Sequence, residues 1–241
     1  MTAPPRLFTL PSVLYRRLCR LMPPLLQYFI RLPSAGLLFI QLLGVLLYPL
    51  MEDTQIGPAL FGAFGIVVLG AALRMVRRSA AVTWIALVLA AAILVLMLAN
   101  ALASAMEIKL SLALLESAFY FYAAGSLIFY MMEDQRATTD ELFAAGATFT
   151  LLAWAFAYLF MACQLVAPDS FVGQVNPGAT RSWMDLLFLS FTTLSGVGVG
   201  DILPLKPFAR AMVMLEEFAG VMYFTLVVSR LIGLTILGAR R

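Results

Sequence analysis

Long apolar stretches separated by short polar breaks dominate this chain, and their lengths set the first expectation. A bilayer span needs roughly 20 mainly apolar residues. Stretches of about that length lie at 35–51, 57–75, 79–101, 110–132, 142–166 and 207–235. A shorter apolar stretch at 183–195 runs into a glycine-rich segment, which favours a re-entrant helix shielded from lipid by other protein. The pattern predicts an all-α membrane protein with six transmembrane helices and one re-entrant helix.

Two capping-box patterns and a proline mark where three of these helices should begin. Ser182 and Asp185, three residues apart, form a capping-box pattern at the start of the short helix. Thr138 and Glu141 repeat the pattern ahead of the fifth long stretch. Pro207 suits the first turn of the sixth.

Composition agrees with a membrane protein, because 63% of the residues are hydrophobic and only 12% are charged. The chain has no His, and its Ser, Cys and carboxylate residues form no recognisable catalytic cluster. We therefore expect no enzyme activity and no cofactor. Nothing in the sequence indicates a nucleic-acid partner.

The positive charges indicate the orientation. Arg residues concentrate in the N-terminal segment, after the second span and at the C-terminal end, whereas the alternate loops hold few. Because positive residues favour the cytoplasmic side, both termini should be cytoplasmic, in a plasma membrane of the bacterial inner-membrane type. Arg and Pro residues interrupt each apolar stretch of the first 33 residues, so we expect no cleaved signal.

Within the N-terminal segment, leucines recur at helical spacing between Pro11 and Pro23, while Arg16, Arg17 and Arg20 occupy other faces. This pattern is typical of a helix lying on an anionic lipid surface. A solvated basic tail explains the same residues equally well.

The most informative stretch is 188–204, where an apolar helix ends on Gly196, Gly198 and Gly200, followed by Asp201. Alternating glycines permit backbone conformations that aim successive carbonyls the same way. Closely spaced carbonyl oxygens can replace the hydration shell of a cation, and the C-terminal end of the preceding helix adds partial negative charge. The stretch therefore favours an ion pathway.

These residues resemble the tetrameric potassium channels, most closely bacterial members with an outer helix, a pore helix and an inner helix. The resemblance covers roughly residues 142–235. It is carried by Thr192, Thr193, Gly198-Val199-Gly200-Asp201, Pro204 and Gly220.

The resemblance implies a channel that conducts potassium or sodium as a homotetramer, with four filters around one axis. The backbone carbonyls of Gly196, Val197, Gly198 and Val199 would bind the monovalent cation, and Gly200 would complete the filter. Gly220 would be a hinge of the inner helix. The residues expected to support the filter are Thr192, Thr193, Ser195, Asp201, Glu216 and Glu217.

Two departures from the family pattern bear on selectivity. Gly196 replaces a threonine at the inner end of the filter, and Val199 replaces the tyrosine or phenylalanine that braces it. Phe188 and Leu189 on the pore helix offer no hydrogen-bonding partner for such a brace. We therefore expect weak selectivity between potassium and sodium.

Carboxylates near the filter have alternative interpretations. Glu216 and Glu217 lie deep in the sixth span, where a charge is costly, so one of them could brace the filter through Thr192 or Ser195. The alternative is a hydrogen bond within the outer loops or a place in a water-filled crevice. Asp201 could concentrate cations or anchor the filter loop.

The fourth span contains no repeated Arg, so the channel should not be voltage-gated. The alternatives are a non-conducting structural membrane subunit and a secondary transporter, although a transporter usually shows a second broken helix. Fourfold symmetry would favour the pore. The expected organisation is a basic amphipathic segment at 1–33, a four-helix region at 34–132, a cytoplasmic linker at 133–141, a pore module at 142–235 and a cytoplasmic tail at 236–241.

Overall fold

The computed structural model describes residues 32–52, 57–77, 82–133 and 138–239. In chain order its elements are α3 (Pro33–Glu52), α4 (Gly57–Val76), α5 (Thr83–Leu102), α6 (Met106–Glu133), α7 (Thr139–Val166), β1 (Phe171–Gly173), α8 (Trp183–Leu194), β2 (Ile202–Pro204), α9 (Pro207–Met222), the π-helical segment η1 (Tyr223–Val228) and α10 (Ser229–Ala239). The segment between Pro11 and Pro23 that is predicted to lie on lipid, with Arg16, Arg17 and Arg20, falls outside the described residues.

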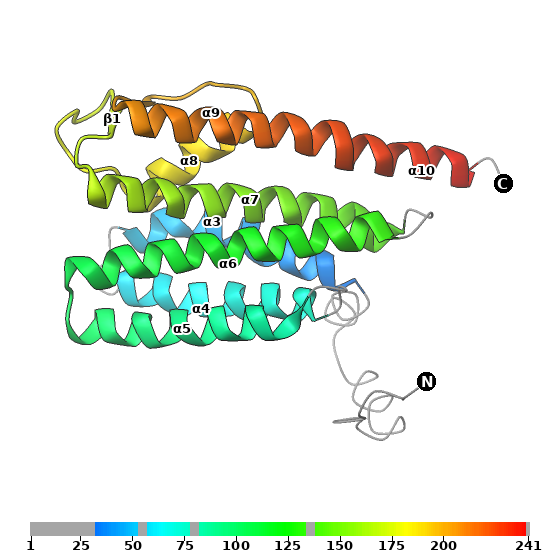
Figure 1. Cartoon of the computed structure of the whole chain (residues 1–241), viewed down its shortest axis with the longest axis horizontal. Helices are drawn as coiled ribbons and strands as arrows, with labels where there is room; N and C mark the ends of the chain where they lie inside the picture. The colour runs from blue at the N-terminus through cyan, green and yellow to red at the C-terminus, as the bar shows by residue number, and fades with distance from the viewer. Residues whose placement is uncertain (1–31, 53–56, 78–81, 134–137, 240–241) are drawn as a thin grey trace, which may run out of the picture.

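The helices lie side by side, with α7 at the centre of the arrangement (Figure 1). α7 packs against α6, α3 and α8, while α5 packs on α6 and α4 on α3. α9, η1 and α10 follow one another as a single long helical run, and α8 lies between the start of this run and α7 (Figure 1). The short helix is therefore enclosed by its own chain on two sides.

The chain is a multi-pass membrane protein by the length and apolar character of its helices. Five described segments meet the requirement for a span: Pro33–Leu50, Thr83–Leu102, Met106–Glu133, Thr139–Val166 and Pro207–Ile236. Within α4 the described apolar part, Gly62–Val76, is shorter, so the sixth span stays a prediction. The all-α prediction is confirmed, with one short antiparallel pairing of β1 and β2 added.

The predicted helix starts are confirmed. Thr138 and Glu141 form the capping box of α7, with the Thr138 amide donating to Glu141 Oε2 at 2.8 Å. Ser182 and Asp185 form the same box at α8, and Pro207 lies in the first turn of α9. These caps satisfy amides that have no partner within their own helix.

Hydrogen bonds connect α3 and α7 across an otherwise apolar interface. Asp140 accepts hydrogen bonds from the amide of Ser34 at 3.1 Å and from its hydroxyl at 2.9 Å. About three helical turns further along α7, the buried Thr150 hydroxyl donates to Gln41 Oε1 at 2.7 Å. Hydrogen bonds between helices stabilise packing where the hydrophobic effect is weak.

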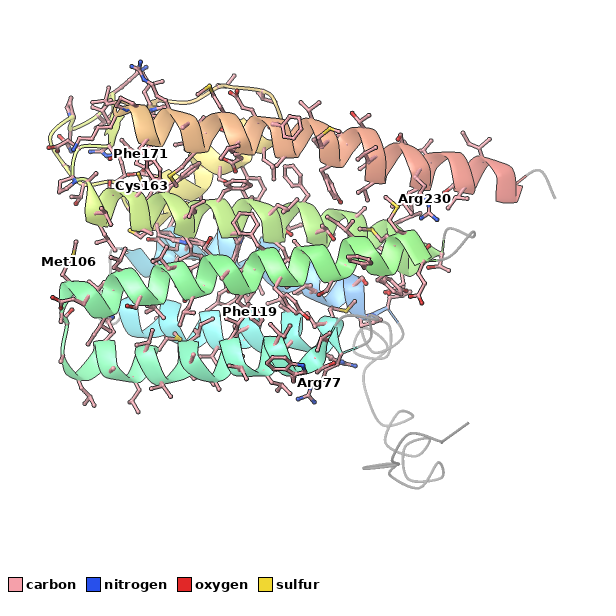
Figure 2. The ribbon with its side chains drawn as sticks, viewed as in Figure 1. Arg77, Met106, Phe119, Cys163, Phe171 and Arg230 are labelled. Atoms are coloured by element: carbon pink, nitrogen blue, oxygen red, sulfur yellow. The ribbon has the colours of Figure 1, made fainter. Side chains whose placement is uncertain are left out.

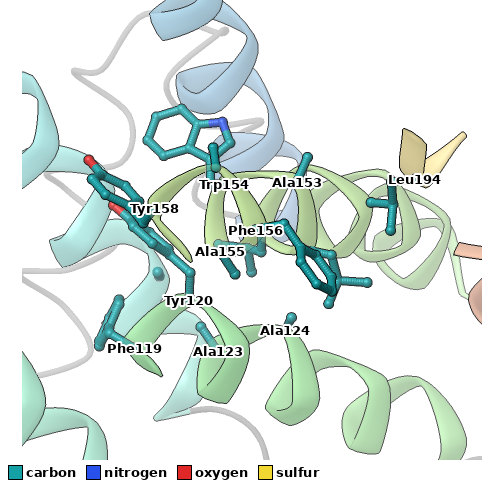
Figure 3. Packing of buried hydrophobic residues seen from close by; sticks show 14 of the residues in the cluster. Phe119, Tyr120, Ala123, Ala124, Ala153, Trp154, Ala155, Phe156, Tyr158 and Leu194 are labelled. Carbon is teal, nitrogen blue, oxygen red and sulfur yellow. The ribbon is translucent and has the colours of Figure 1, made fainter. Parts of the chain in front are cut away.

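Aromatic rings join α3 and α7 to the start of α8. The ring of Trp183, the first residue of α8, lies 5.1 Å from that of Trp154, 5.4 Å from that of Tyr48 and 5.8 Å from that of Tyr158. Figure 3 shows Trp154 and Tyr158 in the packed interior beside Tyr120. Such ring pairs contribute about 0.5–1.5 kcal/mol each beyond their buried area, so α3 and α7 help to hold α8 in place.

At the other end of the bundle, Arg230 connects α10 to α6. Its guanidinium donates to the carbonyl oxygens of Met131, at 2.5 Å, and Met132, at 3.1 Å. These carbonyls belong to the last turn of α6, where a cation interacts favourably with unsatisfied acceptors. Figure 2 shows Arg230 near this end of α6.

Candidate ion-conduction site

The candidate site begins with α8, which is too short to cross a bilayer. Its 12 residues extend about 18 Å, whereas the hydrocarbon core is about 30 Å thick. The chain then returns through residues 195–201 to β2. The predicted re-entrant helix is therefore consistent with the structure.

The loop after α8 folds back on the end of the helix through its amides. The Thr192 carbonyl oxygen accepts from the amides of Val197, at 3.1 Å, and Gly198, at 3.0 Å. The Gly196 amide donates to the Thr193 carbonyl at 2.9 Å. The loop thereby satisfies carbonyls that α8 leaves open at its C-terminus.

The carbonyls of the same loop remain open. None of the carbonyl oxygens of residues 196–199 accepts a hydrogen bond within the described part of the chain. Gly196 and Gly198 have φ values of 72° and 64°, in the left-handed region that glycine adopts without strain. Val197 and Val199 are 64% and 66% exposed in the single chain. The loop thus presents free carbonyl oxygens on an uncovered segment.

The outer end of the loop is anchored by backbone hydrogen bonds. β1 and β2 pair antiparallel, with Val172 opposite Leu203. At one end of this pairing the Gln174 amide donates to the Asp201 carbonyl at 3.0 Å, and beyond the other end the Leu205 amide donates to the Ser170 carbonyl at 2.8 Å. The two strands fix the exit of the loop to the connection between α7 and α8.

A buried guanidinium organises that connection. Arg181 donates to the carbonyls of Val175 at 3.2 Å, Asn176 at 2.6 Å and Ala179 at 3.0 Å. Its own backbone pairs with the side chain of Gln164, which accepts from the Arg181 amide at 2.9 Å and donates to its carbonyl at 3.0 Å. Arg181 therefore joins the end of α7 to the start of α8.

Two side chains of α8 lie behind the outer part of the loop. A Cβ placed on Gly200 would lie 3.7 Å from the Phe188 ring and 3.7 Å from Thr192 Oγ1. Thr192 Oγ1 donates to the Leu189 carbonyl at 2.9 Å. Phe188 thus lies beside the outer part of the loop, in a position where sequence reasoning had found no hydrogen-bonding brace.

Behind α8, the inner helix α9 makes a buried polar contact. Glu216 is fully buried, and its Oε1 is hydrogen-bonded to the hydroxyl of Ser190. The same hydroxyl lies 2.8 Å from the carbonyl oxygen of Ala153 on α7. The contact links α9, α8 and α7 directly behind the helix that carries the loop.

One helical turn further along α9, Gly220 lies against the end of α8. A Cβ on Gly220 would come within 2.9 Å of the carbonyl carbon of Leu194 and 3.1 Å of its Cα, and closer still to its oxygen. Only glycine fits this approach. Gly220 itself lies in regular α-helix, and the π-helical segment η1 begins three residues later, so the hinge role stays a prediction.

The structure changes the expected partners of the acidic residues. Glu216 is hydrogen-bonded to Ser190 and forms no hydrogen bond with Thr192 or Ser195, whose hydroxyls donate to carbonyls within α8 at 2.9 and 3.2 Å. Glu217 is exposed, because adjacent helix residues lie about 100° apart. The Asp201 side chain has no hydrogen bond to a described residue, and its backbone carbonyl provides the anchor.

Sequence reasoning missed Ser190 and Arg181. Ser190 is a polar residue within the apolar half of α8, one turn before Leu194, so it faces the same side. Arg181 directly precedes the capping Ser182. The burial of Arg181 depends on a loop conformation that no local sequence pattern predicts. Thr193, predicted to support the filter, is buried next to the loop.

Comparison with known families agrees with this geometry. Residues 117–236 match the model of a family described as an ion channel. The matched region begins in α6 and contains α7, α8, the loop and the inner helix through most of α10. No curated protein and no solved structure matched the chain. The match supports an ion channel of the potassium-channel superfamily over this region.

Proposed function

We propose that the chain is a channel for monovalent cations, with residues 196–200 as its filter and the carbonyls of residues 196–199 as the ion ligands. One observation carries the proposal. The loop uses its amides to bind the end of α8 while the four carbonyl oxygens accept no hydrogen bond within the described residues. Carbonyl oxygens can replace the water around a potassium or sodium ion without adding charge.

The electrostatics of α8 support the same assignment. α8 ends at Leu194, two residues before Gly196, and the C-terminus of a helix carries about half a negative charge. A cation near the loop is therefore stabilised by both the helix and the carbonyls. Asp201, with no paired cation among the described residues, adds negative charge at the outer end.

A homotetramer is the assembly that completes the site. One chain supplies one loop, whose carbonyls can contact an ion from one side only, whereas four copies around an axis surround it. The exposure of Val197 and Val199 leaves the loop free to face its copies.

Weak discrimination between potassium and sodium follows from two residues. Gly196 provides no hydroxyl at the inner end of the filter, and Val199 provides no aromatic ring behind it. The Phe188 ring lies near Gly200 and has no polar group that could brace a filter side chain through a hydrogen bond. Carbonyls with fewer restraints adapt more easily to the smaller ion.

The proposal is tested by flux through purified protein in liposomes, with potassium and sodium gradients imposed separately. We expect flux of both ions, and a particle mass of four chains in detergent. Folded tetramers that pass neither ion would refute conduction. A conducting monomer or dimer would refute the assembly.

A further inference from the structure

The inner helix and the pore helix are joined along two successive turns. Glu216 and Gly220, one turn apart on α9, meet Ser190 and Leu194, one turn apart on α8. The Gly220 contact is steric and requires only the absence of a side chain. The Glu216 contact is polar and fully buried, so each donor and acceptor in it needs a hydrogen-bond partner.

Ser190 has a single hydroxyl proton but two oxygen neighbours. One neighbour, the Ala153 carbonyl at 2.8 Å, can only accept a hydrogen bond. The other is Glu216 Oε1, which can donate only if the carboxyl is protonated. If Glu216 were ionised, two acceptors would compete for one proton, and one buried oxygen would lose its partner.

The second carboxyl oxygen gives an independent indication. Glu216 Oε2 is buried without a hydrogen-bond partner among the described residues, and the carboxyl forms no ion pair there. A neutral carbonyl oxygen without a partner carries a modest penalty, whereas an unpaired buried carboxylate carries a much larger one. Both oxygens of Glu216 are therefore accommodated best in the neutral acid.

We infer that Glu216 is a neutral acid that donates its proton to Ser190, which donates to Ala153, and that this directed chain of hydrogen bonds positions α8 behind the filter. Glu216 is then a positioning residue. Its importance for conduction rests on the proposed function, whereas its protonation and its contact with Ser190 do not.

The inference distinguishes substitutions of similar size. Glu216→Gln keeps a donor, because the amide nitrogen can replace the acid hydroxyl. Glu216→Leu removes the donor and keeps most of the volume. Ser190→Ala removes the middle of the chain. Glu133→Gln is the matched control, because Glu133 is an exposed carboxylate at the end of α6.

Infrared spectroscopy of the purified protein at neutral pH tests whether Glu216 is protonated. The wild type should show the carbonyl stretch of a protonated carboxylic acid, and the part of this absorption that Glu216→Gln removes should be shifted in Ser190→Ala and unchanged in Glu133→Gln. A wild-type spectrum whose acid band is unaffected by Glu216→Gln would overturn the inference, whether or not the protein conducts.

Bi-ionic reversal potentials test the positioning role. Glu216→Leu and Ser190→Ala should each change the potassium-to-sodium permeability ratio about fivefold, the effect of one ordinary hydrogen bond on an equilibrium. The double variant should be no worse than either single variant, and Glu216→Gln should retain the wild-type ratio. Additive effects, or wild-type ratios in both single variants, would refute positioning. A wild type that passes no ion would refute the proposed function. The infrared result would still decide whether Glu216 is protonated.

Discussion

Replacing Gly220 by alanine tests whether α9 must touch the end of α8. The added Cβ would lie 2.9 Å from the carbonyl carbon of Leu194, whereas ordinary contacts of a Cβ begin at 3.4 Å, so the two helices must separate by at least 0.5 Å. Leu194 is the last residue of α8, so the displacement occurs beside the filter loop. Overpacking of this kind destabilises by about 1–3 kcal/mol.

Gly233→Ala is the matched control, because a Cβ on Gly233 meets nothing within 4 Å. Both substitutions gain helix propensity, up to about 1 kcal/mol, so the difference between the two variants isolates the steric cost. For a chain of this size that cost corresponds to roughly 2–12 °C in unfolding midpoint. We expect Gly220→Ala to unfold at the lower temperature.

The measurement is thermal unfolding in detergent, followed by reversal potentials in liposomes. Gly220→Ala should also change the permeability ratio, because the end of α8 moves. If its midpoint equals that of Gly233→Ala while only gating changes, Gly220 acts as a hinge, and its close approach to Leu194 does not determine stability. That result would refute the reasoning.

Three further predictions concern other parts of the chain. Gly196→Thr, alone or with Val199→Tyr, should shift bi-ionic reversal potentials toward potassium in tetramers that stay folded, although threonine must leave the left-handed φ of 72° that Gly196 adopts. The single change should have the larger share because Phe188 offers no partner for a tyrosine hydroxyl; a wild type already strongly selective would contradict this. Arg230→Gln should lower the unfolding midpoint by removing charge-assisted hydrogen bonds to the last turn of α6, whereas Arg77→Gln, an exposed control, should not. Replacing Arg16, Arg17 and Arg20 by Gln should reduce the response of flux to anionic lipid without preventing tetramer formation, because each charge contributes about 1 kcal/mol of surface attraction; equal responses in wild type and variant would exclude a surface helix.

The helices and their starts could be predicted because local physics determines them. Apolar length alone marks a span, and pairs such as Thr138 and Glu141 mark a start within three residues. The unusual backbone of the loop could also be predicted, because glycines at 196 and 198 permit conformations that other residues avoid. The structure shows them as left-handed φ values.

The partners of buried polar groups could not be predicted in the same way. That Glu216 bonds Ser190 and not Thr192 depends on the rotation of α8 about its axis, which packing against α7 and α9 determines. The burial of Arg181 likewise depends on three loop carbonyls converging on one guanidinium. Contacts between segments far apart in sequence leave no local pattern to detect.

The neighbouring acid, Glu217, supports an assembly of several chains. It lies about 15 Å along the inner helix from its start at Pro207, half the thickness of a bilayer core, and it is exposed in the single chain. Its side chain forms no hydrogen bond or ion pair with a described residue. Because an acidic side chain at this depth is costly to expose to lipid, we expect water or another chain to cover this face of α9. A tetramer around a water-filled axis provides both. Glu217→Leu should then be tolerated only if this face of α9 contacts lipid. Retention of tetramer mass and flux in that variant would argue against a place for Glu217 at a water-filled axis or a chain interface.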